Sequence, residues 1–124
     1  MKDQFEEFIN QRVKGAKLEE VKMILSIFKE EVYKKGILFK KQDTVIQNLG
    51  FLVDGSVRSY FINEKGEEIT SEVLQSKNFL SDIISIRTNE KSPLVIEILE
   101  NSNVLVASME NVWVLLNENI TFNI

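Results

Sequence analysis

Residues 51–69 read FLVDGSVRSYFINEKGEEI, which places two tight turns inside one run of strand-forming residues. The pair Asp54-Gly55 supplies the positive φ that a two-residue hairpin turn needs. Residues 63–66 form a longer polar turn that closes on a glycine. The stretch therefore predicts consecutive antiparallel strands in a small β-fold.

The strand between the two turns, residues 56–62, has apolar residues on both of its sides. The two sides are Val57, Ser59 and Phe61, and Arg58, Tyr60 and Ile62. A strand of this kind packs against the core with one face, and further parts of the chain bury its other face. In a short chain, this pattern predicts the wall of a barrel or sandwich.

Length and composition indicate one globular domain, since the chain has 124 residues, of which 44% are hydrophobic and 27% charged. The formal net charge is −4, which argues against a nucleic-acid-binding surface on this chain because phosphate binding needs clustered Lys and Arg. One local cluster exists, Lys34, Lys35, Lys40 and Lys41. We interpret it as a solvated hairpin whose lysines guard an edge strand.

Two residue types are absent from the chain, histidine and cysteine. Their absence excludes the common zinc sites, cysteine-ligated iron–sulfur clusters, histidine-ligated haem, a thiol nucleophile, an imidazole base and disulfides. The sequence has no apolar run of membrane-spanning length, and its first residues do not resemble a signal peptide. We therefore expect a cytoplasmic protein with no metal site, no membrane partner and no cofactor.

Two amphipathic helices are predicted over residues 1–30. Asp3 can cap the first helix, with Glu6 placed for a capping box, and Gly15 separates the two. The apolar positions at helical spacing are Phe5, Phe8, Ile9 and Val13 in the first helix and Leu18, Val21, Ile24, Leu25 and Phe28 in the second. We expect both helices to lie on the β-core.

Strand signals follow at residues 32–33, 37–39, 45–46 and 69–73, and then pause. Residues 79–92 predict one short helix and a loop that Pro93 ends. The strongest strand signals, residues 94–99 and 104–107, are joined by a polar turn and predict a hairpin. Ser108 can then cap a final helix that holds Val112, Trp113, Leu115, Leu116 and Ile120.

Five segments in this order carry a family resemblance: KGILF (35–39), FLVDGSVR (51–58), KGEEI (65–69), SPLVIEILE (92–100) and VLVAS (104–108). Together they resemble the effector domain of the Crp/Fnr family of bacterial transcription regulators, over nearly the whole chain. The resemblance implies a mainly β fold, an antiparallel double-stranded β-helix or jelly roll of the cyclic-nucleotide-binding-domain type with flanking helices. Residues 1–30 are then N-terminal helices, 31–108 the jelly roll, and 109–124 the start of a dimerisation helix.

Such regulators sense a small molecule in the jelly roll, dimerise through a long helix that follows it, and read DNA with a helix-turn-helix module beyond. The resemblance thus implies a non-catalytic sensor domain that forms a homodimer in the full-length regulator and responds to a small-molecule effector or protein partner. Signal transmission is expected as a shift of the last helix, Val112 to Ile120, between two packings. The sequence stops where that long helix begins, so DNA contact is expected only through a C-terminal domain outside it, and a dissected domain is favoured over a naturally short protein.

The family's ligand-binding residues are replaced here. In members that bind cyclic AMP, a Gly-Glu pair holds the ribose, which corresponds to Ser81-Asp82, and an arginine holds the cyclic phosphate, which corresponds to Lys91 or Ser92. Lysine lacks the bidentate guanidinium fork, and Pro93 lacks a backbone N–H. We therefore expect a degenerate cassette without tight cyclic-nucleotide binding, and its candidate ligand-binding residues are Ser81, Asp82, Ile83, Lys91 and Ser92.

Three other side chains invite a choice of interpretation. Arg58 and Tyr60 either line the pocket or lie on an exterior strand face. Trp113 is interpreted as a core or dimer contact rather than a ligand-stacking residue.

Two further function classes remain beside the sensor. One is a ligand-free dimerisation or interaction module. The other is a cupin-like jelly-roll enzyme in which Glu72, Asp82 or Glu97 supplies acid–base chemistry. Cupin catalysis normally depends on a metal held by histidines, which this chain lacks, so we expect no catalytic residues.

Overall fold

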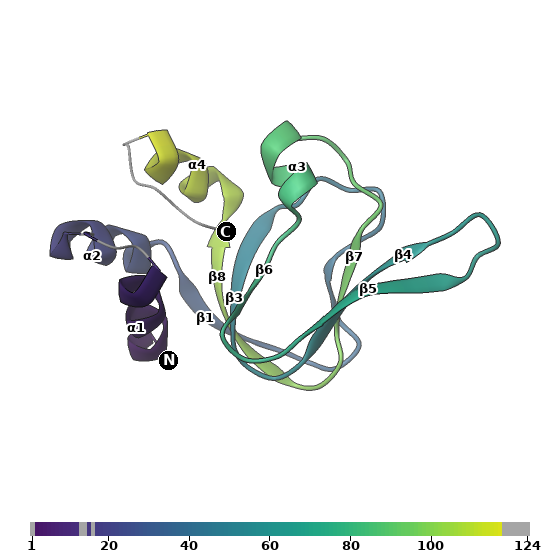
Figure 1. Cartoon of the computed structure of the whole chain (residues 1–124), viewed down its shortest axis with the longest axis horizontal. Coiled ribbons are helices and arrows are strands. Elements are labelled where there is room, and N and C mark those ends of the chain that lie inside the picture. The colour runs from purple at the N-terminus through teal and green to yellow at the C-terminus, as the bar shows by residue number, and fades with distance from the viewer. Residues whose placement is uncertain (1, 13–14, 16, 118–124) are drawn as a thin grey trace.

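Two antiparallel four-stranded sheets form the body of the chain, with helices against one of them (Figure 1). The computed structural model describes residues 2–12, 15 and 17–117. The helices are α1 (Lys2–Arg12), α2 (Leu18–Ser26), α3 (Ile83–Thr88) and α4 (Met109–Asn117). The strands are β1 (Lys29–Tyr33), β2 (Leu38–Lys40), β3 (Asn48–Asp54), β4 (Val57–Ile62), β5 (Glu68–Leu74), β6 (Asn78–Leu80), β7 (Val95–Ile98) and β8 (Ser102–Ser108).

The chain passes repeatedly from one sheet to the other. The first sheet has the strand order β1-β8-β3-β6, and the second has the order β2-β7-β4-β5. Antiparallel strands that alternate between two packed sheets are the arrangement of a jelly roll. The prediction of a mainly β jelly roll with helices at both ends is confirmed.

Strand β3 is apolar on both faces because each face belongs to a different core. Leu52 lies in the core between the two sheets, with Val57, Leu80 and Ile96. Phe51 lies in a second core, between the first sheet and the helices. Both side chains have no exposed surface. The predicted second cover therefore exists, and it consists of helices.

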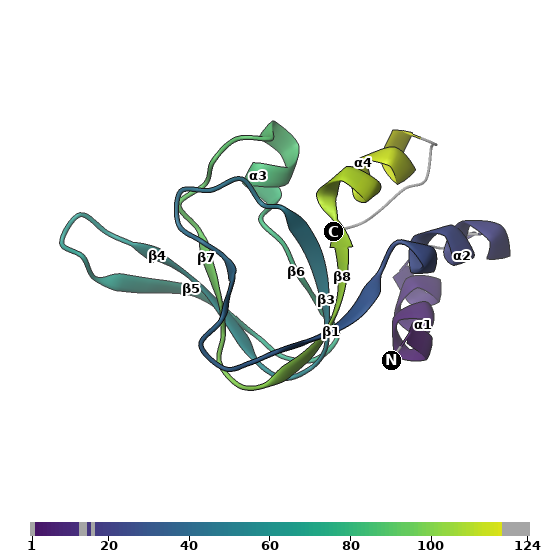
Figure 2. The same cartoon turned by 180° about the vertical axis from the view of Figure 1, so that it is seen from behind.

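Aromatic rings hold helix α1 on the first sheet. The ring of Phe5 lies 4.6 Å from that of Phe51, and the ring of Phe8 lies 4.9 Å from it, measured between centroids. Phe28, just after α2, packs edge-on against Phe5 at 4.7 Å. Helices α1, α2 and α4 gather at one end of the molecule, and the β4–β5 hairpin extends at the other (Figures 1 and 2).

Two of the predicted hairpins are wrong. The Asp54-Gly55 turn joins β3 in the first sheet to β4 in the second, and the turn at 99–101 likewise joins β7 to β8 across the sheets. At each of these two turns the connected strands lie in different sheets and do not pair with each other, because the chain crosses from one layer to the other there. The turn at residues 63–66 does form a true hairpin between β4 and β5, in which the Asn63 N–H donates to the Glu67 carbonyl.

Other boundaries also differ from expectation. Residues 45–46 form no strand, since only Thr44 makes an isolated bridge, with Ser92. The short strand β6 was not predicted as a separate element. Helix α1 begins at Lys2, so Asp3 lies within its first turn rather than before it. The predicted helix positions Val13 and Ile120 lie outside the described residues.

The predicted cap of the last helix is confirmed, because Ser108 Oγ accepts the Asn111 N–H at 3.2 Å. The lysine cluster is not uniformly solvated, however. Lys34, Lys35 and Lys41 are exposed, whereas Lys40 at the end of β2 retains 3% of its accessible surface.

Candidate ligand-binding site

A cavity of about 480 Å³ opens on the side of the jelly roll where strands β5 and β6, the edges of the two sheets, face each other. Helix α1 contributes Phe8 and Arg12 to its wall. The remaining wall comes from β4, β5, β6, the start of α3, the segment that precedes β7, Lys77 between β5 and β6, and Ile96 within β7. Its polar lining residues are Arg12, Ser59, Ser71, Glu72, Lys77, Asn78, Ser81, Asp82, Lys91 and Ser92.

The structure brings the five cassette residues predicted from the sequence to this one cavity. Ser81, Asp82 and Ile83 lie between β6 and the first turn of α3, and Lys91 and Ser92 lie in the loop after that helix. Ile83 and Lys91 are exposed, whereas Asp82 and Ser92 are buried. Proximity in space therefore agrees with the expected cassette, and ligand contact itself stays a prediction.

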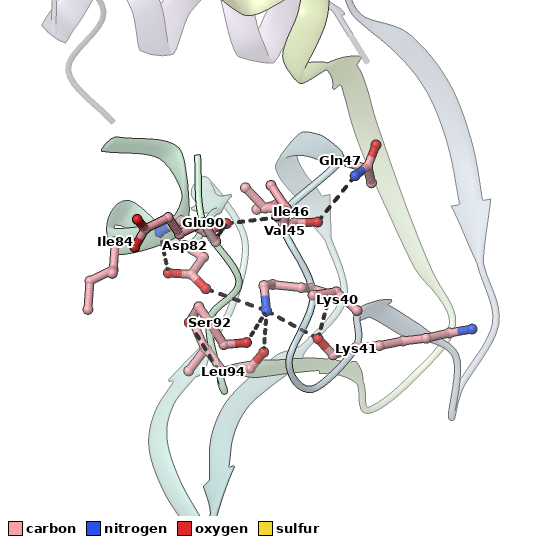
Figure 3. Close-up of polar contacts among 12 residues, drawn as sticks. Lys40, Lys41, Val45, Ile46, Gln47, Asp82, Ile84, Glu90, Ser92 and Leu94 are labelled. Carbon is pink, nitrogen blue, oxygen red and sulfur yellow. Dashed lines mark hydrogen bonds and ion pairs between the residues drawn. The ribbon is translucent and has the colours of Figure 1, made fainter. Parts of the chain in front are cut away.

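Asp82 has a structural role at the start of α3. Its Oδ1 accepts the Ser85 N–H at 3.2 Å, which caps the helix. Its Oδ2 lies 3.6 Å from the Lys40 ammonium, and no donor among the described residues forms a hydrogen bond with that oxygen. Because the carboxylate faces Lys40 (Figure 3), much of its charge is already compensated within the chain.

Lys40 is a buried residue beside the cavity loop whose contacts sequence reasoning missed. Its Nζ donates to the carbonyls of Lys41, Ser92 and Leu94 at 3.1, 3.0 and 2.8 Å (Figure 3). Burial lowers the pKa of Lys40, and the negative charge of Asp82 opposes part of that shift. No sequence signal distinguished Lys40 from the exposed Lys41 beside it, since lysine in a run of lysines is typical of solvated surface.

Backbone N–H groups in the loop after α3 already form hydrogen bonds within the protein. The Ser92 N–H donates to the Thr44 carbonyl at 3.1 Å, and the Leu94 N–H donates to Ser92 Oγ at 3.3 Å. Pro93 between them has no N–H. This part of the loop therefore presents no free backbone N–H to an anion at these three positions.

Ser85 ties the same loop to the rest of the fold. Its Oγ donates to the Glu90 carbonyl at 2.9 Å and accepts the Ile46 N–H at 2.9 Å. Helix α3 then ends at Asn89, which adopts φ 54° and donates its N–H to the Ser85 carbonyl at 2.8 Å. Hydrogen bonds thus connect both ends of the cassette to residues 40–46.

Arg58 and Tyr60 lie together on a different surface and are not among the residues that line the cavity. The Arg58 guanidinium stacks over the Tyr60 ring at 4.2 Å and bonds Glu97 at 2.8 Å and Glu68 at 2.6 Å. Arg58 thus fits the exterior-face interpretation, whereas Tyr60 retains only 7% of its surface. The two residues are therefore not carried into the proposed site.

Metal ligation finds no support in the residues that the structure describes, where no group of three or more carboxylates is placed to share an ion. Over the same ranges, no helix has the length and apolar character needed to cross a membrane.

These features define a class: a jelly roll with a lateral cavity bordered by a short helix and a loop. The cyclic nucleotide-binding domain family matches residues 29–119, and the chain belongs to this family. The family is one of sensory and regulatory domains, so the chain is not an enzyme and the cupin-like alternative is set aside. No curated protein sequence matches the chain.

Solved structures share this fold at low sequence identity. The chain is similar to the catabolite activator protein of Thermus thermophilus, with 23% identity, a TM-score of 0.73, and coverage of 86% of this chain and 49% of that one. It is also similar to the regulatory domain of Toxoplasma gondii PKA solved with cAMP, with 10% identity, a TM-score of 0.80, and coverage of 92% and 44%. The sensor domain of the Pseudomonas aeruginosa transcriptional regulator DNR matches with 16% identity, a TM-score of 0.72, and coverage of 94% and 81%.

The chain thus spans about half the length of the first two of these proteins. At such identities, the likeness establishes the fold alone, which the chain shares with transcription regulators and with a PKA regulatory domain.

Proposed function

We propose that this chain is the effector-sensing domain of a bacterial, cytoplasmic Crp/Fnr-type transcription regulator whose cavity does not bind cyclic AMP tightly. The proposal rests on one observation: polar groups of the cassette already bond to other groups of this chain. A cyclic phosphate needs donors, yet the Ser92 N–H is bonded to the Thr44 carbonyl and the Leu94 N–H to Ser92 Oγ. The carboxylate of Asp82 already faces Lys40.

The effector in this proposal is a small molecule other than a cyclic nucleotide. The cavity offers three cations, Arg12, Lys77 and Lys91, beside an apolar wall that includes Phe79 and Ile96. In the full-length regulator, residues 31–108 form the sensing jelly roll and residues 109–124 begin a dimerisation helix. DNA contact is made by a C-terminal domain outside this sequence.

A thermal-shift assay tests the proposal directly, because a ligand that binds only the folded state raises the melting temperature. We expect no shift with cyclic AMP or cyclic GMP at low micromolar concentration, and a shift with a member of a metabolite panel. A melting-temperature rise with micromolar cyclic AMP would contradict the proposal.

A gain-of-function variant provides the matched comparison. Ser92→Arg combined with Pro93→Ser restores a guanidinium fork and a backbone N–H, and Lys91→Arg tests the other alignment of the arginine. We expect cyclic AMP to stabilise one of these variants more than the wild type.

A second candidate is a ligand-free dimerisation or interaction module. Helix α4 favours it, because its buried side, Met109, Val112 and Leu115, leaves Trp113 and Val114 with 36% and 53% of their surface exposed. Sedimentation of the wild type and of a Trp113→Ala variant separates the two. Dimerisation that depends on Trp113, with no response to any ligand, favours the module.

A further inference from the structure

All three N–H donors of the buried Lys40 ammonium form hydrogen bonds. A lysine ammonium has three N–H donors, and Lys40 Nζ bonds three carbonyl oxygens within 3.1 Å. Two of these carbonyls, at Ser92 and Leu94, belong to the loop that borders the cavity. The third belongs to Lys41, so the ammonium joins the end of β2 to the loop before β7.

The contact between Lys40 and Asp82 is therefore electrostatic. The Nζ to Oδ2 distance is 3.6 Å, and the two side chains retain 1% and 3% of their surface. A buried ammonium is costly unless it has charged and hydrogen-bonding partners, and removing one member of such a pair leaves the other uncompensated. Asp82 from the start of α3 and Asp43 from the turn after β2 are the charged groups that face it.

We propose that Lys40 is a positioning residue, an internal counter-ion that holds Asp82 and residues 90–94 in one arrangement. Here the charge comes from the chain itself, and it acts from behind the cavity wall, because Lys40 is not one of the lining residues. This inference concerns the loop alone and does not depend on the regulatory role proposed above.

Hydrogen exchange of single amides, followed by NMR on the intact chain, tests this proposal. The informative amides are those of Ser92, bonded to the Thr44 carbonyl, and Asn89, bonded to the Ser85 carbonyl. We expect Lys40→Met to accelerate exchange of the Ser92 amide about tenfold or more. The Asn63 amide in the remote β4–β5 turn should exchange as in the wild type.

Lys41→Met is the matched control, because Lys41 is the neighbouring lysine, is exposed, and takes part only through its carbonyl. It should leave the Ser92 amide unchanged. Equal exchange in the wild type and Lys40→Met, or equal acceleration in both variants, overturns the proposal.

A pH titration followed by NMR separates an effect of the Lys40 charge from an effect of packing. It also tests the proposal if Lys40→Met does not fold. The chemical shifts of the Ser85 and Ser92 amides should follow deprotonation of a lysine below pH 10.5 in the wild type, and this step should persist in Lys41→Met. Asp82→Asn retains an oxygen that can cap α3 but removes the negative charge. The step should then move to lower pH, because, of the two carboxylates that oppose the desolvation of Lys40, only Asp43 keeps its charge. A titration that is unaffected by Asp82→Asn overturns the proposal.

Discussion

Gly55 lies directly against Ser102, so that a Cβ on Gly55 would come within 2.9 Å of the Ser102 Cα atom. Gly55 also has a φ of +124°, which L side chains rarely adopt. The chain crosses between the sheets at this point, and Ser102 begins strand β8 beside it. Two independent constraints therefore require glycine here.

Gly55→Ala is expected to lower the free energy of unfolding by about 2–4 kcal/mol, as backbone strain and steric overlap add. Gly66→Ala is the control, because Gly66 also has a positive φ, of +80°, but a Cβ there has no neighbour within 4 Å. It should cost only about 1–2 kcal/mol. Urea denaturation measures both, and equal losses would contradict the close approach to Ser102.

The aromatic cluster should contribute strongly to stability. Phe51 has no exposed surface and contacts the rings of Phe5, Phe8 and Phe79. Phe51→Ala is expected to cost about 3–5 kcal/mol because the cavity it leaves separates α1 from the sheet. Phe61→Ala, at a position that is 38% exposed, should cost about 1 kcal/mol or less. Similar losses in urea melts of the two variants would show that the helices are not held by this cluster.

Ser85 should matter more than the neighbouring Thr88, although both hydroxyls form two hydrogen bonds. Ser85→Ala leaves the buried Ile46 N–H without its acceptor, at a cost of about 1–3 kcal/mol. Thr88 is exposed, and Thr88→Ala should change the free energy of unfolding by a few tenths of a kcal/mol, roughly the value of a solvated bond. The comparison fails if Thr88→Ala is as destabilising as Ser85→Ala.

Alkaline stability should depend on Tyr33. Burial, followed by the nearby Glu31 carboxylate, raises the pKa of Tyr33 to about 12 from 10.0. Between these two values the folded state binds more protons than the unfolded state, so the contribution of Tyr33 is complete below pH 10 and is lost as the pH rises towards 12. The expected slope is at most about 1.4 kcal/mol per pH unit.

Urea melts between pH 9 and 11.5 measure this slope in the wild type and in Tyr33→Phe, which lacks the titrating hydroxyl. The variant should lose stability less steeply over that interval. Parallel curves for the two proteins would place the pKa of Tyr33 at its ordinary value.

The candidate site was predictable only where the resemblance supplied an alignment. Residues 81–83 and 91–92 meet at one cavity as the cassette alignment implied. Arg58 and Tyr60 do not, because strict alternation along β4 turns Ser59 and Phe61 towards the cavity and places Arg58 and Tyr60 on the opposite face, where Arg58 bonds Glu97. Lys40 carried no signal, since its burial follows from the loop that folds over it from 52–54 positions further along the chain.

By itself, the sequence determined the fold class: the turn residues, the strand-forming runs and the apolar spacing of the terminal helices act locally, and each is set by neighbours within a few positions. The tertiary structure alone decided which strands pair and which lysine of a cluster is buried. It also decided that Gly55 lies against Ser102, which adds a steric requirement for glycine to that of its positive φ. These properties depend on segments that are distant in sequence and are brought together only when the two sheets close. The stretch at residues 51–69 thus indicates a small antiparallel β-fold, whereas the partners of its first turn come from β8.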